Sequence, residues 1–566
     1  MHDADQNSDF RRPWLQSYPD DVQSEISCDE SETLCTMFDG VCRNFPQAKA
    51  WTFYDRSVTY ASAQKTVLAL ASFLQNSMGL RKGEKLALIM PNMIQYPICV
   101  FAGLKCGLTI VNINPLYTAR EIGGVLRDAK ASCVVAFSGV GERLCELAEE
   151  MELPPVIITE LGDMTGFFKG AILNFAAKYL VKAVKPFKLN GSIAFKKAVR
   201  AGKASSFSPC EISSSDIAFL QFTGGTTGKP KGAMLSHGNL IANVKQCLEM
   251  YGHELQRGTE TMLTALPLYH VFSMTVNLLL QTAIAANSIL IADPRKISEL
   301  IAVIRKHPEI SVMTGVNTLF AAMLEHGVFS SLCPMPNLRL AIGGGAAVQS
   351  GVAERFFKAS GQHILEGYGL TECSPVACVN PYTSRIFTGS IGIPVPSTLA
   401  RIVDTNTHEE IWDQGVAGEL EFKGPQIMQG YYNNARENEH VYDEGWLRTG
   451  DIAVWLEGGY LKLIDRIKDM IIVSGFNVYP SEIEDVVSRN ARVRECCAVG
   501  VPSEKTGEKI KLFVVKKDPS LTKEELLDYC RRELTGYKLP KIVEFIDALP
   551  KSPVGKIMRR YLLQRN

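Results

Sequence analysis

One short segment of the chain has a composition suited to binding phosphate. Residues 222–232 contain four glycines, three threonines and two lysines in eleven positions. Glycines leave backbone N–H groups accessible, threonines add hydroxyl donors and lysines add positive charge, so the segment predicts a polyphosphate ligand. The spacing is not that of a Walker A loop, because Pro230 follows Lys229 where that motif has Ser or Thr. P-loop kinases and GTPases are therefore disfavoured, and a plain surface turn is the alternative.

Five further motifs follow this segment along the chain. They are Ala-Leu-Pro-Leu-Tyr-His at 265–270, Glu-Gly-Tyr-Gly-Leu-Thr-Glu at 366–372, Gly-Trp-Leu-Arg-Thr-Gly-Asp at 445–451, Asp-Arg-Ile-Lys-Asp at 465–469 and Pro-Lys-Ser-Pro-Val-Gly-Lys at 550–556. In type and order the six motifs resemble those of the acyl-adenylate-forming enzymes, which include acyl-CoA synthetases, luciferases and peptide-synthetase adenylation domains. The resemblance runs from about Trp14 to the C-terminus. It is greatest to bacterial long-chain fatty acid–CoA ligases, through phrases such as Val-Ser-Gly-Phe-Asn-Val-Tyr-Pro at 473–480.

The resemblance implies that these motifs bind ATP. The first segment would hold the departing pyrophosphate through Thr223, Gly224, Gly225, Thr226, Thr227, Gly228, Lys229 and Lys231. Tyr368 would stack on adenine, and close approach of the nucleotide would be allowed by three small residues, Gly344, Gly345 and Ala346. The other nucleotide-binding residues implied for the motif at 366–372 are Glu366, Gly367, Gly369 and Thr371.

Charged residues carry the remaining roles that the resemblance implies. Glu372 would be the Mg²⁺ ligand, since one carboxylate plus phosphate oxygens commonly holds this ion. Asp451 and Arg466 would bind the ribose, because a carboxylate accepts two hydrogen bonds from vicinal hydroxyls and a guanidinium donates a fork of its own. Lys556 is expected to be catalytic, since the family's lysine at this place reaches the substrate carboxylate and the α-phosphate. Gly475 would admit the pantetheine of coenzyme A.

His270 is expected to lie beside the carboxylate pocket. A lone histidine is more often a packed or hydrogen-bonded residue than an acid or base, so we assign it positioning rather than proton transfer. Some long-chain members of the family have a tryptophan four residues later that gates the acyl tunnel, whereas this chain has Met274. An aromatic gate is therefore in doubt, although a flexible methionine can line such a tunnel.

Length and composition limit the class of protein. A chain of 566 residues suggests two or more domains, and 60 basic residues balance 60 acidic ones, which gives no global attraction to nucleic acid. Fifteen cysteines include no C-x-x-C pair, and the polar start of the chain does not resemble a signal peptide, so reduced thiols in a cytoplasm are expected. The most apolar run, 276–292, is short and interrupted by polar residues, which favours a buried element over a membrane span.

The pattern of apolar residues predicts a layered α/β fold. Residues 85–90 and 132–137 are predicted to be buried strands and 61–77 a helix, which indicates a largely parallel sheet with helices around it. From Ile386 onward shorter strands with Gly and Pro turns predict a small β-subdomain. We expect an AMP-binding domain at 1–464, a hinge at 465–468 and a small, mobile α+β domain at 469–566 that carries the catalytic lysine.

Residues 165–203 form the most distinctive segment outside the motifs. They contain nine basic residues and no acidic one, interleaved with aromatic and aliphatic side chains. As one helix the segment would place Lys178, Lys182 and Lys185 on a common face, the pattern of a helix lying on an anionic membrane surface. An ordinary surface helix packed on the body of the protein explains the pattern equally well.

The leading hypothesis is an ATP- and Mg²⁺-dependent ligase that makes long-chain acyl-AMP and then acyl-CoA. Its partners would be a long-chain fatty acid, ATP and coenzyme A, with no nucleic acid, and a homodimer is left open. We expect it in the cytoplasm, with peripheral contact to the inner membrane face left open. The alternatives are an aryl- or medium-chain-CoA ligase, an acyl-AMP ligase that delivers to a carrier protein, and a membrane-docked component for fatty acid binding or uptake.

Overall fold

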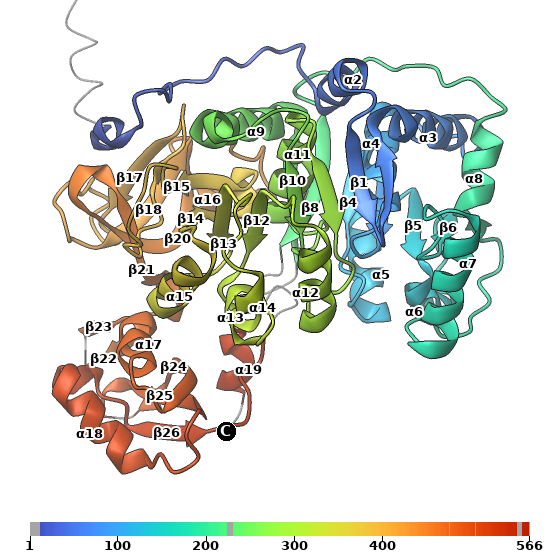
Figure 1. Cartoon of the computed structure of the whole chain (residues 1–566). Coiled ribbons are helices and arrows are strands. Elements are labelled where there is room, and N and C mark those ends of the chain that lie inside the picture. The colour runs from blue at the N-terminus through green and yellow to red at the C-terminus, as the bar shows by residue number, and fades with distance from the viewer. Residues whose placement is uncertain (1–11, 224–229, 475, 504, 552–556, 565–566) are drawn as a thin grey trace, which may run out of the picture.

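The computed structural model describes residues 12–223, 230–474, 476–503, 505–551 and 557–564. These residues form a larger part built on three sheets and a C-terminal domain built on a fourth (Figure 1). The expected fold class is confirmed: a large α/β region, a small β-subdomain and a small α+β domain. None of the helices in the described ranges combines the length and the apolar character that crossing a bilayer requires.

The first large sheet has a parallel centre of six strands, with antiparallel strands at both edges. Strands buried on both faces need nearly continuous apolar runs, and the central strands are buried throughout. In sheet order the strands are β16 (Ile393–Pro394), β15 (Val376–Val379), β14 (Ile364–Gly369), β13 (Leu340–Gly344), β12 (Val312–Gly315), β10 (Thr261–Thr264), β11 (Asn287–Leu290), β1 (Lys49–Phe53) and β2 (Arg56–Thr59).

The second large sheet has six parallel strands and one antiparallel edge strand, β9. The strands expected at 85–90 and 132–137 are confirmed as β3 and β5. In sheet order the strands are β7 (Ile193–Ala194), β6 (Val156–Thr159), β5 (Cys133–Phe137), β3 (Lys85–Ile89), β4 (Thr109–Asn112), β8 (Ile217–Thr223) and β9 (Lys231–Ser236).

Helices surround these two sheets (Figure 1). The helix expected at 61–77 is confirmed as α3 (Tyr60–Ser72), which continues into a π-helical turn, η2 (Phe73–Ser77). The apolar run expected to be buried is divided among the π-helical segment η6 (Met274–Leu280), α11 (Gln281–Ala283) and β11, and all of these residues are buried. The other helices of the larger part are α2 (Leu34–Asn44), α4 (Gln95–Lys105), α5 (Ala119–Ala129), α6 (Gly141–Glu150), α7 (Phe167–Phe175), α8 (Phe195–Gly202), α9 (His237–Tyr251), α10 (Val271–Ser273), α12 (Ile297–Lys306), α13 (Asn317–Glu325), α14 (Phe329–Leu332), α15 (Ser350–Ser360) and α16 (Ala435–Val441).

The β-subdomain expected after Ile386 is a five-stranded antiparallel sheet. Its strands are β17 (Leu399–Val403), β18 (Gly418–Lys423), β20 (Trp446–Trp455), β19 (Tyr442–Asp443) and β21 (Leu461–Arg466). The N-terminal turn η1 (Pro13–Ser17) packs on this sheet, where Trp14 is buried and stacks on Trp455 with ring centroids 5.8 Å apart. The backbone of η1 lies so close to Gly459 that a Cβ on this glycine would lie 2.3 Å from the Trp14 backbone nitrogen.

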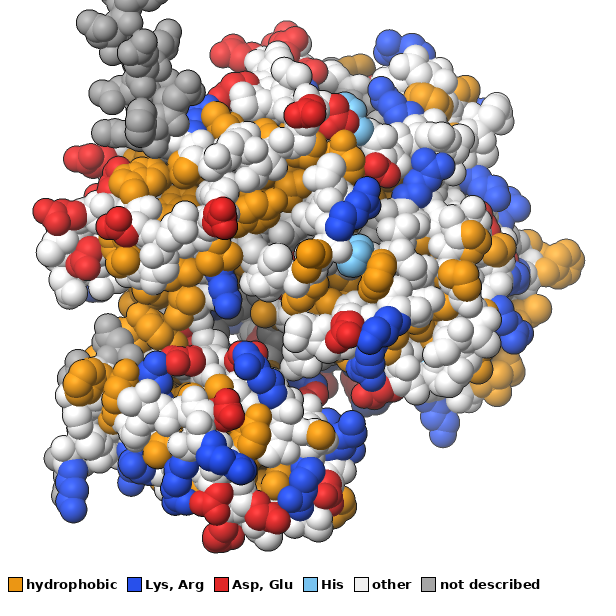
Figure 2. All heavy atoms as spheres, turned by 60° about the vertical axis from the view of Figure 1, so that its left-hand side comes forward, with side chains coloured by type: hydrophobic (Ala, Val, Ile, Leu, Met, Phe, Trp, Pro, Cys, Tyr) orange, Lys and Arg blue, Asp and Glu red, His pale blue; other side chains and the backbone are white. Residues whose placement is uncertain are grey.

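The C-terminal domain follows β21 and has its own core. It contains β22 (Ile471–Val473), β23 (Phe476–Val478), β24 (Val493–Ser503), β25 (Gly507–Lys516) and β26 (Ile542–Phe545), with α17 (Pro480–Ser488), α18 (Lys523–Glu533) and α19 (Arg559–Leu563). A furrow separates this domain, at the lower left, from the larger part on the face shown in Figure 2. The residues expected to form the hinge, 465–468, lie where β21 ends, and their hinge role stays a prediction.

The crossing of α3 and α8 gives a test of the packing. Gly202, at the end of α8, lies so close to α3 that a Cβ would fall 1.7 Å from the Ala69 carbonyl oxygen. We expect Gly202→Ala to lower the free energy of unfolding by about 1–3 kcal/mol, because the helices must separate. Gly124→Ala in α5 is the matched control, since nothing lies within 4 Å of its Cβ position. Urea unfolding that ranks the two variants equally would contradict this account.

Candidate active site

The predicted phosphate segment connects the two strands of a hairpin. Thr223 ends β8 and Lys231 begins β9, and the two residues are paired across the ladder. The Thr223 hydroxyl donates to the Lys231 carbonyl oxygen at 3.4 Å. Six residues of the prediction lie outside the described residues: Gly224, Gly225, Thr226, Thr227, Gly228 and Lys229. The hairpin therefore fixes the two ends of the segment.

The glycine motifs meet at the carboxyl ends of two parallel strands. Gly344 ends β13 and pairs with Gly367 of β14, and a Cβ on Gly344 would lie 3.1 Å from the Gly367 carbonyl oxygen. Gly345 follows with a φ of +76°, and Ala346 is exposed. Ligands of open α/β sheets bind at this edge, so the small residues lie where a nucleotide would approach.

Gly369 has a structural role that the resemblance did not indicate. A Cβ at this position would lie 1.8 Å from the Pro375 carbonyl oxygen, because β14 and β15 are joined by a tight connection. That connection contains the short helix η7 (Thr371–Cys373), which holds Thr371 and Glu372. Glycine at 369 thus allows the turn that presents Glu372.

A buried carboxylate joins two of the sheets. Asp451 of β20 is 3% exposed, and one of its oxygens accepts a hydrogen bond from the Tyr368 hydroxyl at 2.6 Å. Its other oxygen lies 3.0 Å from Nε of Arg466, the residue paired with it on β21. Burial, followed by the charge of Asp451, raises the pKa of Tyr368, so the phenol stays a neutral donor. The hydrogen bond was not expected from the sequence, and stacking of Tyr368 on adenine stays a prediction.

Glu372 and Lys231 each have a partner from the segment after β18. The Tyr431 hydroxyl donates to Oε1 of Glu372 at 2.6 Å, and Glu437 of α16 forms an ion pair with Lys231. Lys231 also lies over the Tyr431 ring, 5.3 Å from its centroid. Sequence reasoning missed Tyr431 and Glu437, because no motif marks them and their contacts span 59 and 206 positions.

These contacts bring the predicted residues into one electrostatic environment. Burial alone would lower the pKa of Arg466. The negative charges of nearby acids, which include Asp451 and Glu372, outweigh this effect, so the pKa is raised. Burial, together with Arg466 and more weakly Lys231, lowers the pKa of Lys468 in the expected hinge. Among the residues implied for Mg²⁺, ribose and phosphate, Glu372, Asp451, Arg466 and Lys231 therefore lie near one another.

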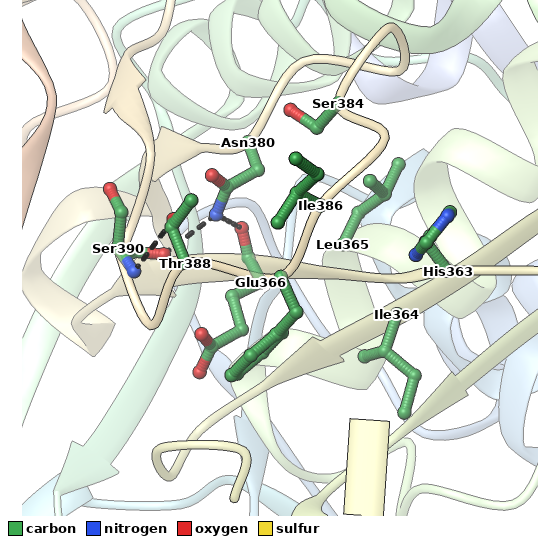
Figure 3. Close-up of a pocket in the computed structure, with 10 residues that line it drawn as sticks. His363, Ile364, Leu365, Glu366, Asn380, Ser384, Ile386, Thr388 and Ser390 are labelled. Carbon is green, nitrogen blue, oxygen red and sulfur yellow. Dashed lines mark hydrogen bonds between the residues drawn. The ribbon is translucent and has the colours of Figure 1, made fainter. Parts of the chain in front are cut away.

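Glu366 lies in β14 beside a small pocket, as Figure 3 shows. Its side chain is buried, and Oε1 accepts a hydrogen bond from the Val348 backbone at 2.8 Å. Its carbonyl oxygen accepts from Asn380 at 3.1 Å. Burial raises the pKa of Glu366 to about 7, against a partial lowering by the Val348 hydrogen bond. The carboxyl is therefore near half protonation at neutral pH.

His270 is the residue directly before α10, and its positioning role stays a prediction. Its Nδ1 accepts a hydrogen bond from the Phe272 backbone at 3.4 Å. The preceding carbonyl, of Tyr269, accepts from the Gln221 side chain at 2.9 Å, and Gln221 in turn accepts from Asn112 at 3.0 Å. Met274 is fully buried, with its sulfur 3.6 Å from the Asn112 side-chain nitrogen. A buried polar network thus fixes the backbone next to His270, while tunnel gating by Met274 stays a prediction.

Two further expected site residues lie outside the described residues, Gly475 and Lys556. Their roles at coenzyme A and in catalysis therefore stay predictions. Among the residues that are described, no group of three or more His, Cys, Asp or Glu side chains could hold a metal ion.

Comparison with known proteins agrees with this geometry. The model of the AMP-binding enzyme family matches residues 38–432, and that of the AMP-binding enzyme C-terminal domain matches residues 482–556. The chain belongs to the AMP-binding enzyme family. The second match lies inside the domain expected at 469–566, although the exact boundaries stay predictions.

Relatives in this family match over nearly the whole chain. A long-chain-fatty-acid–CoA ligase of Escherichia coli O6:H1 is 46% identical over 553 residues, which cover 98% of each chain. The ligase of the same name from Haemophilus influenzae is 43% identical over 553 residues, with 97% of each chain covered. An ATP-bound RpMatB–BxBclM chimera has a TM-score of 0.80 at 25% identity, over 94% of this chain and 98% of that chain. A benzoate CoA ligase from Burkholderia xenovorans, at 23% identity and a TM-score of 0.80, shows the same fold over 94% of this chain and 100% of that chain.

The raised pKa of Glu366 predicts a pH dependence of stability. The unfolded side chain has a pKa near 4.5 and the folded one near 7, so the folded state holds the proton more tightly. Protonated Glu366 therefore contributes its full amount to the free energy of unfolding below the unfolded pKa, and this contribution is lost as the pH rises through 7. We expect Glu366→Gln, which keeps an acceptor for Val348, to gain about 3 kcal/mol relative to the parent between pH 4.5 and 8.

Paired urea unfolding curves of parent and variant at pH 4.5, 6, 7 and 8 check this prediction. Glu354→Gln on α15 is the control, because Glu354 is exposed and its pKa is lowered rather than raised, chiefly by a hydrogen bond to Lys358. A difference between Glu366→Gln and the parent that stays constant with pH would show that the carboxyl ionises normally.

Proposed function

We propose that this protein is an ATP- and Mg²⁺-dependent long-chain fatty acid–CoA ligase. The observation that carries the proposal is the 43–46% identity to ligases of that name over at least 97% of each chain. Two neighbouring groups of contacts support it: Asp451 with Tyr368 and Arg466, and Tyr431 with Glu372 and Lys231. A component that only binds fatty acids needs no nucleotide site.

In the first half-reaction the fatty acid carboxylate attacks the α-phosphate of ATP and pyrophosphate leaves. Asp451 would accept hydrogen bonds from the ribose hydroxyls, and Arg466 beside it holds the carboxylate in place. Lys231 would exchange Glu437 for the departing phosphates. Lys556 would stabilise the charge on the pentavalent phosphorus, as positioned positive groups do.

Glu372 fits the role of a Mg²⁺ ligand. Tyr431 donates to one of its oxygens, which orients the carboxylate. Since the described residues offer no group of three acidic, His or Cys side chains, the ion would be shared with phosphate oxygens, as Mg²⁺ commonly is. When bound, the ion would neutralise phosphate charge.

In the second half-reaction the thiol of coenzyme A attacks the acyl carbon of acyl-AMP and AMP leaves. Gly475 would leave room for pantetheine, and rotation about 465–468 would replace Lys556 by the thiol at the same site. The acyl-CoA product would serve lipid metabolism, including β-oxidation, from a place in the cytoplasm at the inner membrane face. Whether the protein forms a homodimer does not affect this scheme.

One assay separates this function from the alternatives. We expect CoA-dependent AMP release to be fastest with palmitate or oleate across a series from acetate to oleate, with benzoate and coumarate far slower. Lys556→Ala should lose pyrophosphate release without CoA yet convert supplied acyl-AMP and CoA to thioester, and Gly475→Leu should do the reverse. Faster turnover of aromatic acids would favour an aryl-CoA ligase. Pyrophosphate release with fatty acid and ATP, but no AMP release when CoA is added, would favour an acyl-AMP ligase that delivers to a carrier protein.

The ion pair between Lys231 and Glu437 gives a separate test. ATP must displace a carboxylate from Lys231, so Glu437→Gln should lower KM for ATP by about 2–5-fold, the range expected for a partly exposed pair. Glu439→Gln is the control, because it removes the same charge from an exposed position of the same helix. A raised KM for ATP in Glu437→Gln alone would instead show that Glu437 orients Lys231 for binding.

A further inference from the structure

Helix α7 and the π-helical turn η4 (Ala176–Leu180) expose an unusual number of large apolar side chains. Figure 1 places α7 at the outer edge of the larger part, away from the C-terminal domain. Phe168, Ile172, Phe175 and Tyr179 are 81%, 66%, 57% and 57% exposed. Their spacing of four, three and four residues places them on one side of a helix, so they form a continuous stripe. Three more exposed apolar residues lie beside this stripe: Phe167, Leu180 and Val181.

The opposite side of the same helix is built from small residues. Gly170 and Ala177 are buried, and a Cβ on Gly170 would lie 2.3 Å from the Gly162 carbonyl oxygen. Asn174 accepts a hydrogen bond from the Gly162 backbone at 2.7 Å and donates to Glu160 at 2.5 Å. Rotation that buried the apolar stripe would force large side chains into the contact with Gly162. The helix is therefore held with its apolar side outward.

The charge around the stripe is positive. Residues 165–203 contain no acidic side chain, and Lys178, Lys182 and Lys188 form no ion pair with a described residue. The expectation that Lys178, Lys182 and Lys185 share a helix face is wrong, because the helix ends at Leu180 and Lys182 has a φ of +54°. Lys185 pairs with Glu142 at 2.7 Å. Exposed Lys178 and Lys182 nevertheless lie within three residues of Tyr179, and exposed Lys188 follows in the same segment.

We propose that α7 and η4 dock this protein on an anionic lipid bilayer, with the apolar stripe at the acyl boundary and the lysines at the headgroup phosphates. Amphipathic helices that lie on membranes combine aromatic and aliphatic side chains with lysine in this way. A protein partner is less suited to the surface, since lysine is depleted at protein interfaces. The docking itself does not require the ligase function, although a bilayer is where a long-chain acid would be collected.

Vesicle binding tests the proposal directly. The full chain would be sedimented with vesicles of phosphatidylcholine alone and of phosphatidylcholine with about a third phosphatidylglycerol, at low and high salt. We expect F168S/I172S/Y179S to bind both vesicle types at least about tenfold more weakly than the parent. We expect K178Q/K182Q/K188Q to lose about tenfold or more on anionic vesicles at low salt and nothing on neutral ones.

Matched controls keep the outcome interpretable. K65Q/K517Q/K541Q removes three exposed lysines from other surfaces and should bind like the parent. All three variants should keep the parent's thermal unfolding midpoint, since the altered side chains are exposed, and its turnover of a soluble short-chain acid. Equal vesicle binding by parent and both α7 variants would overturn the proposal. So would a parent dimer in sedimentation velocity that F168S/I172S/Y179S converts to monomer, because the stripe would then be a protein interface.

Discussion

The rest of the site depends on a buried negative charge, the carboxylate of Asp451. A carboxylate removed from water is costly unless it is hydrogen-bonded and paired, and here Tyr368 and Arg466 supply both kinds of partner. Those partners lie on different sheets. Tyr368 belongs to β14 of the first large sheet, whereas Arg466 lies in the β-subdomain together with Asp451 itself. Satisfying one charge therefore fixes the β-subdomain against the first large sheet.

The same principle applies to the charged residues around it. Glu372 has a hydrogen bond from Tyr431, and Lys231 has an ion pair with Glu437. Each charged group is thus already compensated before any nucleotide binds, and binding becomes an exchange of partners. Such an exchange costs less reorganisation than orienting free side chains, which is the general advantage of a preorganised polar site.

The sequence was sufficient to predict the layered fold, because the buried strands are continuous apolar runs. It also predicted the β-subdomain, because the pattern changes there to short strands between Gly and Pro turns. It also assigned Thr223 and Lys231 to one phosphate-binding segment, and the structure pairs these two residues across a hairpin that the sequence did not predict. It did not reveal Tyr431 or Glu437, whose contacts depend on how the segment between β18 and β19 packs against the two large sheets. The sequence also did not predict which side of α7 faces outward. A residue pattern shows that a helix has two different sides, but the contact of Gly170 with Gly162 decides which side is buried.

The position of Trp14 ties the beginning of the chain to its chemistry. This side chain fills a place on the β-subdomain next to Trp455, in the same strand that carries Asp451 four positions earlier. The turn η1 (Pro13–Ser17) thus supports the strand that carries Asp451. Shortening the chain past this turn would remove an aromatic side chain that is buried against that sheet, so a fragment beginning at residue 38, where the family match begins, would lack part of the support for the strand that carries Asp451.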